Sequence, residues 1–362
     1  MKKIGIYYDS LVSIGGAERV VIELANMLGA DIITSGYDSK VNEWVPIKNQ
    51  VIDIGNVSIK FLKPIGTLFE APIRYYFSRK RFKYEINIFF GSTSIFASNK
   101  QNKNIWYCFS PNRILYDLRN LKLNDSSFIR RILFMLYIKL FNRLDQEIVK
   151  TNFSNIISQS YNIQKRVRKY YNIDSSVIYG PIDTNKFKFE RFGDFYLTVS
   201  RLFPEKRVSL IVKAFIKIPE KKLVIVGNGP EKNKIKNLIK GHTNITLFND
   251  ISDKELYNLY GNCLATVFMA RDEDYGLIPI EGMAAGKSCI AVDEGGCKET
   301  IIDGKTGFLI KATEENIIRA VKKLDIKEAR KMRNNCLEWV KRFDTKECIK
   351  QWKKELRDLK II

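Results

Sequence analysis

The sequence predicts an α/β protein made of two doubly wound, Rossmann-like domains. Its 362 residues, 45% of them hydrophobic, are enough to bury two cores in domains of about 150 to 200 residues. The chain opens with a strand, a helix and a second strand in succession. A second alternation of strands and helices begins after a polar stretch at residues 183–194.

The N-terminal half begins as a βαβ unit. Residues 3–8 have the pattern of a strand, Gly15-Gly16 end the loop that follows, and apolar residues at 20, 21, 24 and 28 have helical spacing. A second strand is expected at residues 31–34. Two helices that mix aromatic and basic residues follow, at 61–84 and 128–144, before a strand at 155–158. We assign residues 1–180 to this domain.

The second domain is expected at residues 190–343. Strands are predicted at residues 196–200, 223–226, 245–248, 266–268 and 289–292. Helices are predicted to begin near Val208, Glu231, Asp253, Ile278 and Lys298. Such alternation is typical of a doubly wound parallel sheet. The tail is charged and helical, and residues 344–362 are expected to pack back on the first domain.

The chain is strongly basic. It carries 61 Lys and Arg against 40 Asp and Glu, a formal charge of +21. Residues 51–170 hold 21 basic and 7 acidic residues, so +14 of that charge lies in this third of the chain. The excess indicates an anionic partner: nucleic acid, a phosphate-bearing substrate or an acidic membrane surface. Charge alone does not choose among the three.

Cysteine and histidine usage indicates neither a zinc site nor a disulfide framework. The six cysteines are scattered without a Cys-x-x-Cys pair, and His242 is the only histidine. No apolar run reaches 18 residues, and the apolar start is too short for a signal peptide. We therefore expect a cytoplasmic protein, at most peripheral to the cytoplasmic membrane face.

The most informative stretch is residues 271–286, at a predicted strand-to-helix junction. Glu273 and Glu281 flank a loop whose backbone N–H groups lie at a helix N-terminus, and ligands bind at this edge of an open parallel sheet. A helix beginning near Leu277 places Glu281 in its second turn, where its carboxylate can accept hydrogen bonds from vicinal hydroxyls. Alone, the stretch fits a solvated acidic loop equally well.

Further motifs occur in a fixed order along the chain. They are Gly15-Gly16-Ala17-Glu18-Arg19, Arg201-x4-Lys206, Gly227-x-Gly229-Pro230, the Glu273-x7-Glu281 pair and the segment from Asp303 to Leu309. Together they closely resemble the retaining GT-B glycosyltransferases of family 4, also called glycosyl transferases group 1, over nearly the whole chain. The resemblance implies two Rossmann-like domains with a cleft between them, and a nucleotide-sugar donor site on the second.

The resemblance also implies roles for individual residues. Arg201 and Lys206 match a diphosphate clamp, in which fixed cations stabilise the charge that grows on the departing nucleoside diphosphate. Glu281 matches the residue that binds the ribose hydroxyls, and Glu273 the one that approaches the donor sugar. Our catalytic candidates are therefore Arg201, Lys206 and Glu273. The donor site adds the backbone amides of Tyr275, Gly276 and Leu277, and Gly16, which matches the glycine that lets the first helix approach the phosphates.

Two local patterns suggest other ligands. Asp272-Glu273-Asp274 contains an Asp-x-Asp, which holds a divalent metal in the other major glycosyltransferase fold. Because Arg201 and Lys206 supply fixed cations, we expect no metal and no other cofactor. The segment from Gly227 to Pro230 lacks the third glycine of a dinucleotide-binding fingerprint.

The N-terminal half indicates the subfamily. Residues 106–117 and 177–184 resemble segments of family 4 mannosyltransferases of polysaccharide and lipid-linked oligosaccharide assembly. In that family the position of Phe109 is usually histidine, and we take Phe109 and Arg113 as candidates for the acceptor side. Retaining transfer in this fold is thought to use the departing phosphate as the base, so phenylalanine is compatible with activity. A catalytically degenerate homologue remains an alternative.

We predict a retaining hexosyltransferase that moves mannose or glucose from a GDP- or UDP-sugar to a glycan or a polyprenyl-phosphate-linked acceptor. The interleaved basic and aromatic residues of 61–84 and 128–144 suit an anionic membrane surface. A nucleic-acid-binding protein explains the charge, but no zinc finger or RNP signature is present and the glutamate pair is left unexplained. We therefore expect no nucleic-acid partner. A sugar epimerase or phosphorylase on the same fold stays open.

Overall fold

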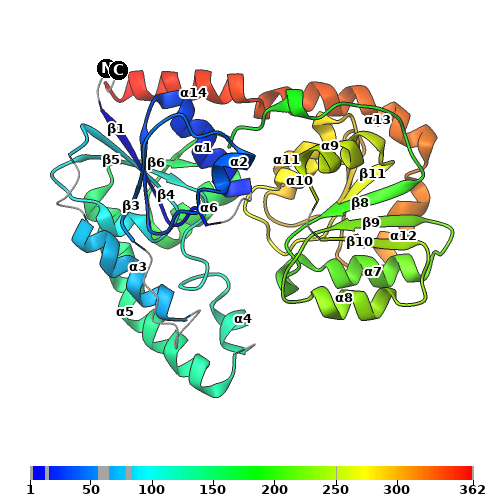
Figure 1. Cartoon of the computed structure of the whole chain (residues 1–362), viewed down its shortest axis with the longest axis horizontal. Helices are drawn as coiled ribbons and strands as arrows, with labels where there is room; N and C mark the ends of the chain where they lie inside the picture. The colour runs from blue at the N-terminus through cyan, green and yellow to red at the C-terminus, as the bar shows by residue number, and fades with distance from the viewer. Residues whose placement is uncertain are drawn as a thin grey trace. The chain divides into compact units, whose positions relative to one another are not determined.

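The computed structural model describes residues 3–12, 16–55, 65–78, 83–124, 126–249 and 251–360. It divides into two compact units, Met1–Pro181 with Ile349–Ile362 and Ile182–Cys348. Each unit holds one parallel β-sheet with helices packed on it (Figure 1). The predicted fold class, two parallel-sheet α/β domains, is confirmed.

The sheet of the first unit has seven strands in the order β3-β2-β1-β4-β5-β6-β7. They are β1 (Ile4–Tyr8), β2 (Asp31–Thr34), β3 (Val51–Asp53), β4 (Ile86–Phe90), β5 (Lys103–Cys108), β6 (Asn155–Ser158) and β7 (Ser176–Val177). The strand order reverses beside β1, which pairs with β2 on one side and β4 on the other. The sequence pattern had predicted no strand at β3, β4 or β5. In the chain, β3 precedes the first of the two helices rich in aromatic residues, and β4 and β5 lie between those helices.

Helices cover this sheet. They are α1 (Gly16–Leu28), α2 (Val41–Trp44), α3 (Ile65–Ser78), α4 (Arg119–Asn124), α5 (Phe128–Asn152) and α6 (Tyr161–Tyr171), with a short 3₁₀ turn, η2 (Ser94–Ala97). The last helix, α14 (Thr345–Asp358), lies along this unit from residue 349 onward. There Trp352 is fully buried against Tyr107, with ring centroids 5.3 Å apart, and Glu355 accepts a hydrogen bond from the Ser176 hydroxyl.

The sheet of the second unit has the order β10-β9-β8-β11-β12-β13. Its strands are β8 (Phe195–Val199), β9 (Lys222–Val226), β10 (Ile245–Phe248), β11 (Ala265–Phe268), β12 (Cys289–Val292) and β13 (Gly307–Ile310). Its helices are α7 (Val208–Ile216), α8 (Lys232–Ile239), α9 (Asp253–Asn262), α10 (Leu277–Ala284), α11 (Cys297–Thr300), α12 (Glu314–Lys323) and α13 (Ile326–Trp339), with 3₁₀ turns η3 (Thr184–Lys186), η4 (Pro204–Lys206) and η5 (Val340–Phe343). The sequence had missed β13 and α12.

The two aromatic helices, α3 and α5, divide their side chains between core and solvent. Tyr75, Tyr137 and Phe141 are buried in the core of the first unit, whereas Phe77 and Phe128 are largely exposed. The basic residues expected near α3 at positions 60, 63, 79, 80 and 81 lie outside the described residues. None of the helices in the described part of the chain is both long enough and apolar enough to cross a membrane.

All six cysteines are buried and none of them forms a disulfide. Burial raises the pKa of the thiols of Cys263, Cys289 and Cys336, each to about 12. The thiols of these three residues are therefore protonated at neutral pH and act as small apolar groups in the core.

Candidate active site

The candidate catalytic residues of the second unit follow two neighbouring strands. β8 pairs with β11, with Tyr196 opposite Ala265, and the strand order reverses there because β9 and β10 lie on one side and β12 and β13 on the other. The loop after β8 carries Arg201 and Lys206, and the loop after β11 carries Glu273. Both loops leave the carboxyl ends of their strands, which is where open parallel sheets bind ligands.

The structure brings Lys206 and Glu273 into direct contact. The Lys206 Nζ lies 2.5 Å from the Glu273 Oε2, and the two side chains are only 18% and 19% exposed. A backbone hydrogen bond from the Arg271 N–H to the Glu205 C=O, 2.7 Å long, ties the same two loops together. The ion pair therefore joins residues 67 positions apart on a fixed scaffold at the sheet edge.

Arg201 lies on the same loop but is held differently. Its side chain is exposed, and its guanidinium lies 5.8 Å from the centre of the Phe203 ring. It forms no ion pair with a carboxylate in the described parts of the chain. Arg201 thus presents its five N–H donors to solvent, ready for an anion.

Glycines let the surrounding loops approach the acidic loop closely. Gly295 has φ 54°, and a Cβ there would lie 2.4 Å from the Glu273 carbonyl oxygen. The next residue, Gly296, donates its N–H to that same oxygen at 2.7 Å. Any side chain at position 295 would push this loop away, so Gly295-Gly296 sets the position of the Glu273 backbone.

Two further residues brace the site and were missed by sequence reasoning. Arg207 has φ 52° and pairs with the Glu294 Oε1 at 2.9 Å, while the Glu294 Oε2 accepts the Asp272 N–H at 3.1 Å. Glu294 therefore links the loop after β8 to the acidic loop. The sequence could have indicated these two residues only by their neighbours, since Arg207 directly follows Lys206 and Glu294 directly precedes Gly295-Gly296.

Helix α10 begins after Gly276, whose φ of 92° forms a left-handed cap, and Glu281 lies in its second turn. The buried Tyr260 hydroxyl donates a hydrogen bond to the Glu281 Oε2. Burial, reinforced by the Glu281 charge, raises the pKa of Tyr260 well above its ordinary value, so this hydroxyl stays a donor. Tyr275, just before the cap, is buried and forms a T-shaped pair with Phe343, with ring centroids 6.1 Å apart. Leu277 is the first residue of the helix.

The remaining candidates belong to the first unit. Gly16 is the first residue of α1. Phe109 is almost buried in an aromatic cluster with Tyr8, Phe90 and Tyr107, at ring-centroid distances of 6.4, 5.5 and 5.5 Å. The Gln159 amide donates to the Phe109 carbonyl at 2.8 Å. Phe109 therefore packs as a core aromatic residue at the position where the sequence resemblance implied histidine.

Arg113 belongs to a charged cluster in the same unit. Its Nε donates to the Asp117 Oδ2 at 2.8 Å, and the buried Arg166 lies 3.8 Å from the same oxygen. Arg166 also donates to the Ser110 hydroxyl at 3.3 Å. Two guanidinium groups therefore share one carboxylate.

Asp9 was not singled out by the sequence. It follows β1 at the point where the strand order of the first unit reverses, and its carboxylate accepts the N–H groups of Ser92, Thr93 and Ser94 at 3.1, 3.0 and 2.7 Å. Burial raises the pKa of Asp9, and these three hydrogen bonds oppose that shift. The sequence could have indicated Asp9 as a site residue only by its position directly after the first strand.

The acidic loop does not form a metal cage. Within the residues that the structure describes, no three His, Cys, Asp or Glu side chains gather closely enough to hold a metal ion. Asp272 sits in a left-handed conformation, φ 44°, and Glu273 faces Lys206.

Comparison with known proteins shows similarity to glycosyltransferases. Residues 182–342 match the sequence profile of glycosyl transferases group 1. Over 86% of this chain and 87% of the relative, it is 26% identical to the alpha-1,3/1,6-mannosyltransferase ALG2 of Dictyostelium discoideum. The chain is a glycosyltransferase with a GT-B fold, and its residues 182–342 form a domain of glycosyl transferases group 1.

The glycosyltransferase also resembles other proteins, one in sequence over about half of its length and two in fold over nearly all of it. It is 27% identical to the O-antigen chain mannosyltransferase RfbU of Salmonella typhimurium, over 52% of this chain and 54% of that one. Its fold is similar to that of Anabaena HepE, solved with UDP and glucose, with a TM-score of 0.77 at 17% identity over 99% of this chain and all of that one. A sucrose-phosphate synthase of Thermosynechococcus elongatus gives the same score and identity, with 99% of each chain covered.

Proposed function

We propose that this glycosyltransferase moves a hexose, mannose or glucose, from a GDP- or UDP-sugar to a glycan or a lipid-linked saccharide with retention at the anomeric carbon. The observation that carries the proposal is the Lys206–Glu273 pair at the strand-order reversal, with Arg201 on the same loop. The names of two relatives, both mannosyltransferases, support mannose, and the UDP and glucose complex of a structural neighbour supports the alternative.

The proposed roles follow from charge. When the bond between the anomeric carbon and the phosphate oxygen breaks, the nucleoside diphosphate gains negative charge, which Arg201 and Lys206 stabilise. Lys206 already neutralises Glu273, so donor binding places a phosphate beside a shared cation. Glu281 accepts hydrogen bonds from the ribose hydroxyls while Tyr260 holds its other side. With fixed cations in place, we propose that no metal ion is needed.

In the transfer step the acceptor hydroxyl forms a bond to the anomeric carbon on the face that the phosphate leaves. Its proton passes to a departing phosphate oxygen, so no protein base is required. This scheme is compatible with phenylalanine at position 109. We propose that Arg113 faces the acceptor, because a guanidinium can bind the phosphate of a polyprenyl-phosphate-linked acceptor.

The acceptor class leads to a proposed place of action, an anionic membrane surface. Residues 128–144 of α5 contain Arg130, Arg131, Lys139 and Arg143, all exposed, and no acidic residue. Each basic residue near an anionic bilayer contributes about 1 kcal/mol of attraction. Four of them suffice for reversible, salt-sensitive docking.

The test is a screen of UDP- and GDP-linked glucose and mannose for nucleoside diphosphate release, with and without saccharide acceptors. We expect one base and one sugar to dominate, and proton NMR of the first product to show the anomeric configuration of the donor. Inversion at the anomeric carbon would reject the retaining mechanism. Failure to cleave any of the four donors would reject the proposed function.

A further inference from the structure

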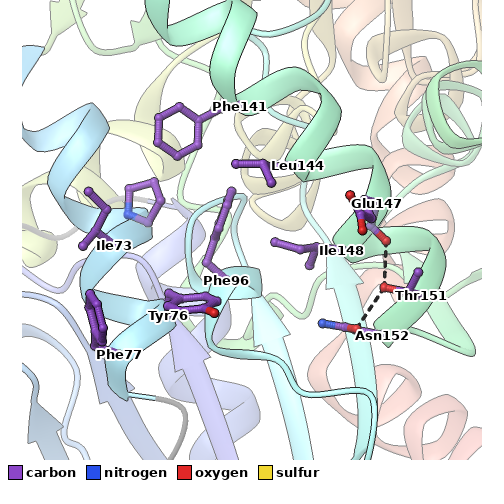
Figure 2. A pocket seen from close by; sticks show the side chains of 11 residues that line it. Ile73, Tyr76, Phe77, Phe96, Phe141, Leu144, Glu147, Ile148, Thr151 and Asn152 are labelled. Carbon is purple, nitrogen blue, oxygen red and sulfur yellow. Dashed lines mark hydrogen bonds between the residues drawn. The ribbon is translucent and has the colours of Figure 1, made fainter.

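An apolar groove runs between α3 and α5 of the first unit. Ile73, Tyr76 and Phe77 line it from α3, Leu144 and Ile148 from α5, and Phe96 of η2 lies between them (Figure 2). Its cavity volume is about 430 Å³. This size lies within the range of small-molecule sites, roughly 300 to 1,000 Å³, which are also mostly apolar.

At one end of the groove the hydroxyl and amide groups are already engaged, and the exposed side chain of Glu147 also lines this end. The Thr151 hydroxyl donates to the Glu147 carbonyl at 2.9 Å and contacts the Asn152 side chain at 3.0 Å (Figure 2). The Asn152 amide in turn donates to the Ser98 hydroxyl at 2.9 Å. Because the hydroxyl and amide groups satisfy one another and the Glu147 carboxylate repels an anionic group, this end of the groove favours a hydrocarbon.

The groove is continuous with an exposed apolar stripe on α5. Leu144 lines the groove and also ends the stripe, whose other members recur every three to four residues toward the start of the helix: Phe128, Ile129, Ile132, Met135, Leu136 and Leu140. The helical period of 3.6 residues places Lys139 and Arg143 on the same face. Basic residues among exposed apolar ones are typical of helices that lie in a membrane interface, where long cationic side chains reach the headgroups.

We propose that the α3–α5 groove takes up one acyl chain of an anionic phospholipid while α5 lies on the bilayer. Residues 128–144 carry four cations and no acid, whereas Glu147 lines the groove, so the anionic headgroup lies toward the start of α5 beside Lys139 and Arg143 and the apolar lining takes the chain. This deepens the proposed membrane-surface function by naming the lipid contact. It gives the docked enzyme a fixed depth and orientation, which electrostatic attraction alone does not.

The experiment uses vesicles of phosphatidylglycerol that contain a trace of the same lipid with a diazirine on its acyl chain. After flotation and illumination, mass spectrometry maps the adducts on the bound protein. We expect adducts within residues 72–77 and 141–148. The groove variant Ile73→Gln/Leu144→Gln keeps every charge, so it should still float, but its groove adducts per bound protein should fall about tenfold because it lines the groove with amides.

The control is Phe128→Gln/Ile129→Gln, which removes two apolar side chains, 78% and 72% exposed, from the far end of the stripe. It should keep the groove adducts per bound protein. Ile73 is 51% exposed and Leu144 46% exposed, so the groove variant should fold, and its melting temperature checks this. If it does not fold, Phe77→Gln at a 73% exposed position replaces it.

Several outcomes would overturn the proposal. They are wild-type adducts confined to residues 128–136, groove adducts unchanged in the groove variant, absence of flotation with anionic vesicles, and displacement of the adducts by polyprenyl phosphate but not by phosphatidylglycerol. Cross-linking does not depend on catalysis. A chain that cleaves its donor yet gives no groove adducts would refute only this inference, whereas adducts without donor cleavage would refute only the proposed transfer reaction.

Discussion

Lys206 gives the sharpest prediction, because the structure allows two explanations for it. At 2.5 Å from the Glu273 oxygen, and with an effective dielectric constant of about 20, the gross attraction is about 7 kcal/mol before desolvation is subtracted. A lysine held so firmly either stabilises the diphosphate or merely neutralises Glu273. If it stabilises the diphosphate, Lys206→Ala removes a contact of about 2.7 to 4 kcal/mol, a loss in kcat of about 10² to 10³.

A double-mutant cycle separates the two explanations. We expect Lys206→Ala to lower kcat at saturating donor by at least about tenfold both in the wild-type background and in the Glu273→Gln background. Nucleoside diphosphate release measures it. The matched control is Lys298→Ala, which breaks a 3.1 Å pair with Asp293 in the same unit and should leave kcat unchanged. If Glu273→Gln restores the activity that Lys206→Ala loses, the lysine is only a counter-ion and the clamp assignment is wrong.

The other predictions concern ribose, metal and pH. Glu281→Gln keeps an acceptor for the Tyr260 hydroxyl, so its ligand-free melting temperature should match wild type while donor affinity, measured by titration calorimetry, falls; equal affinity would refute the ribose assignment. Activity should persist in EDTA, and loss that magnesium or manganese reverses would reinstate a metal. Asp145 is buried, with Tyr116 and Tyr171 donating to one oxygen, and burial raises its pKa to about 6. This folded-state pKa exceeds the unfolded value of about 3.9, so the protonated carboxyl of Asp145 stabilises the folded chain. Its contribution is fully present below about pH 3.9, and about 3 kcal/mol of the free energy of unfolding is lost as pH rises through 6. Urea unfolding of wild type and Asp145→Asn from about pH 4 to 8 should show this loss in wild type only, and parallel curves would exclude it.

The second unit was the more predictable from sequence, for a physical reason. Its strands are short, mostly buried and separated by helices with clear apolar spacing, so their positions follow from periodicity. The predicted strand at residues 289–292 coincides with β12, and the helix expected near Leu277 begins at that residue. In the first unit, β4 and β5 lie between aromatic helices whose side chains are apolar on most faces, and the periodic contrast is lost.

Contacts between distant loops were not predictable. Nothing local in the sequence shows that Glu294 bridges Arg207 and the Asp272 N–H, or that Tyr260 supports Glu281, because these pairs form only when separate strand ends meet. The sequence also did not show which apolar side chains of α5 are buried and which are exposed. Its sequence is apolar almost all round, and only the packing of Tyr137 and Phe141 into the core decides which apolar residues remain outside.

The central claim is that the loops after β8 and β11 form a nucleotide-sugar site, and nucleoside diphosphate binding tests it most directly. A ligand present at 100 times its Kd stabilises the folded chain by about 2.7 kcal/mol, which thermal unfolding detects easily. The account predicts that UDP or GDP raises the melting temperature of the wild type and raises it less in Lys206→Ala, while oligonucleotides leave it unchanged. A rise with oligonucleotides alone, or an equal rise in wild type and Lys206→Ala, would contradict it.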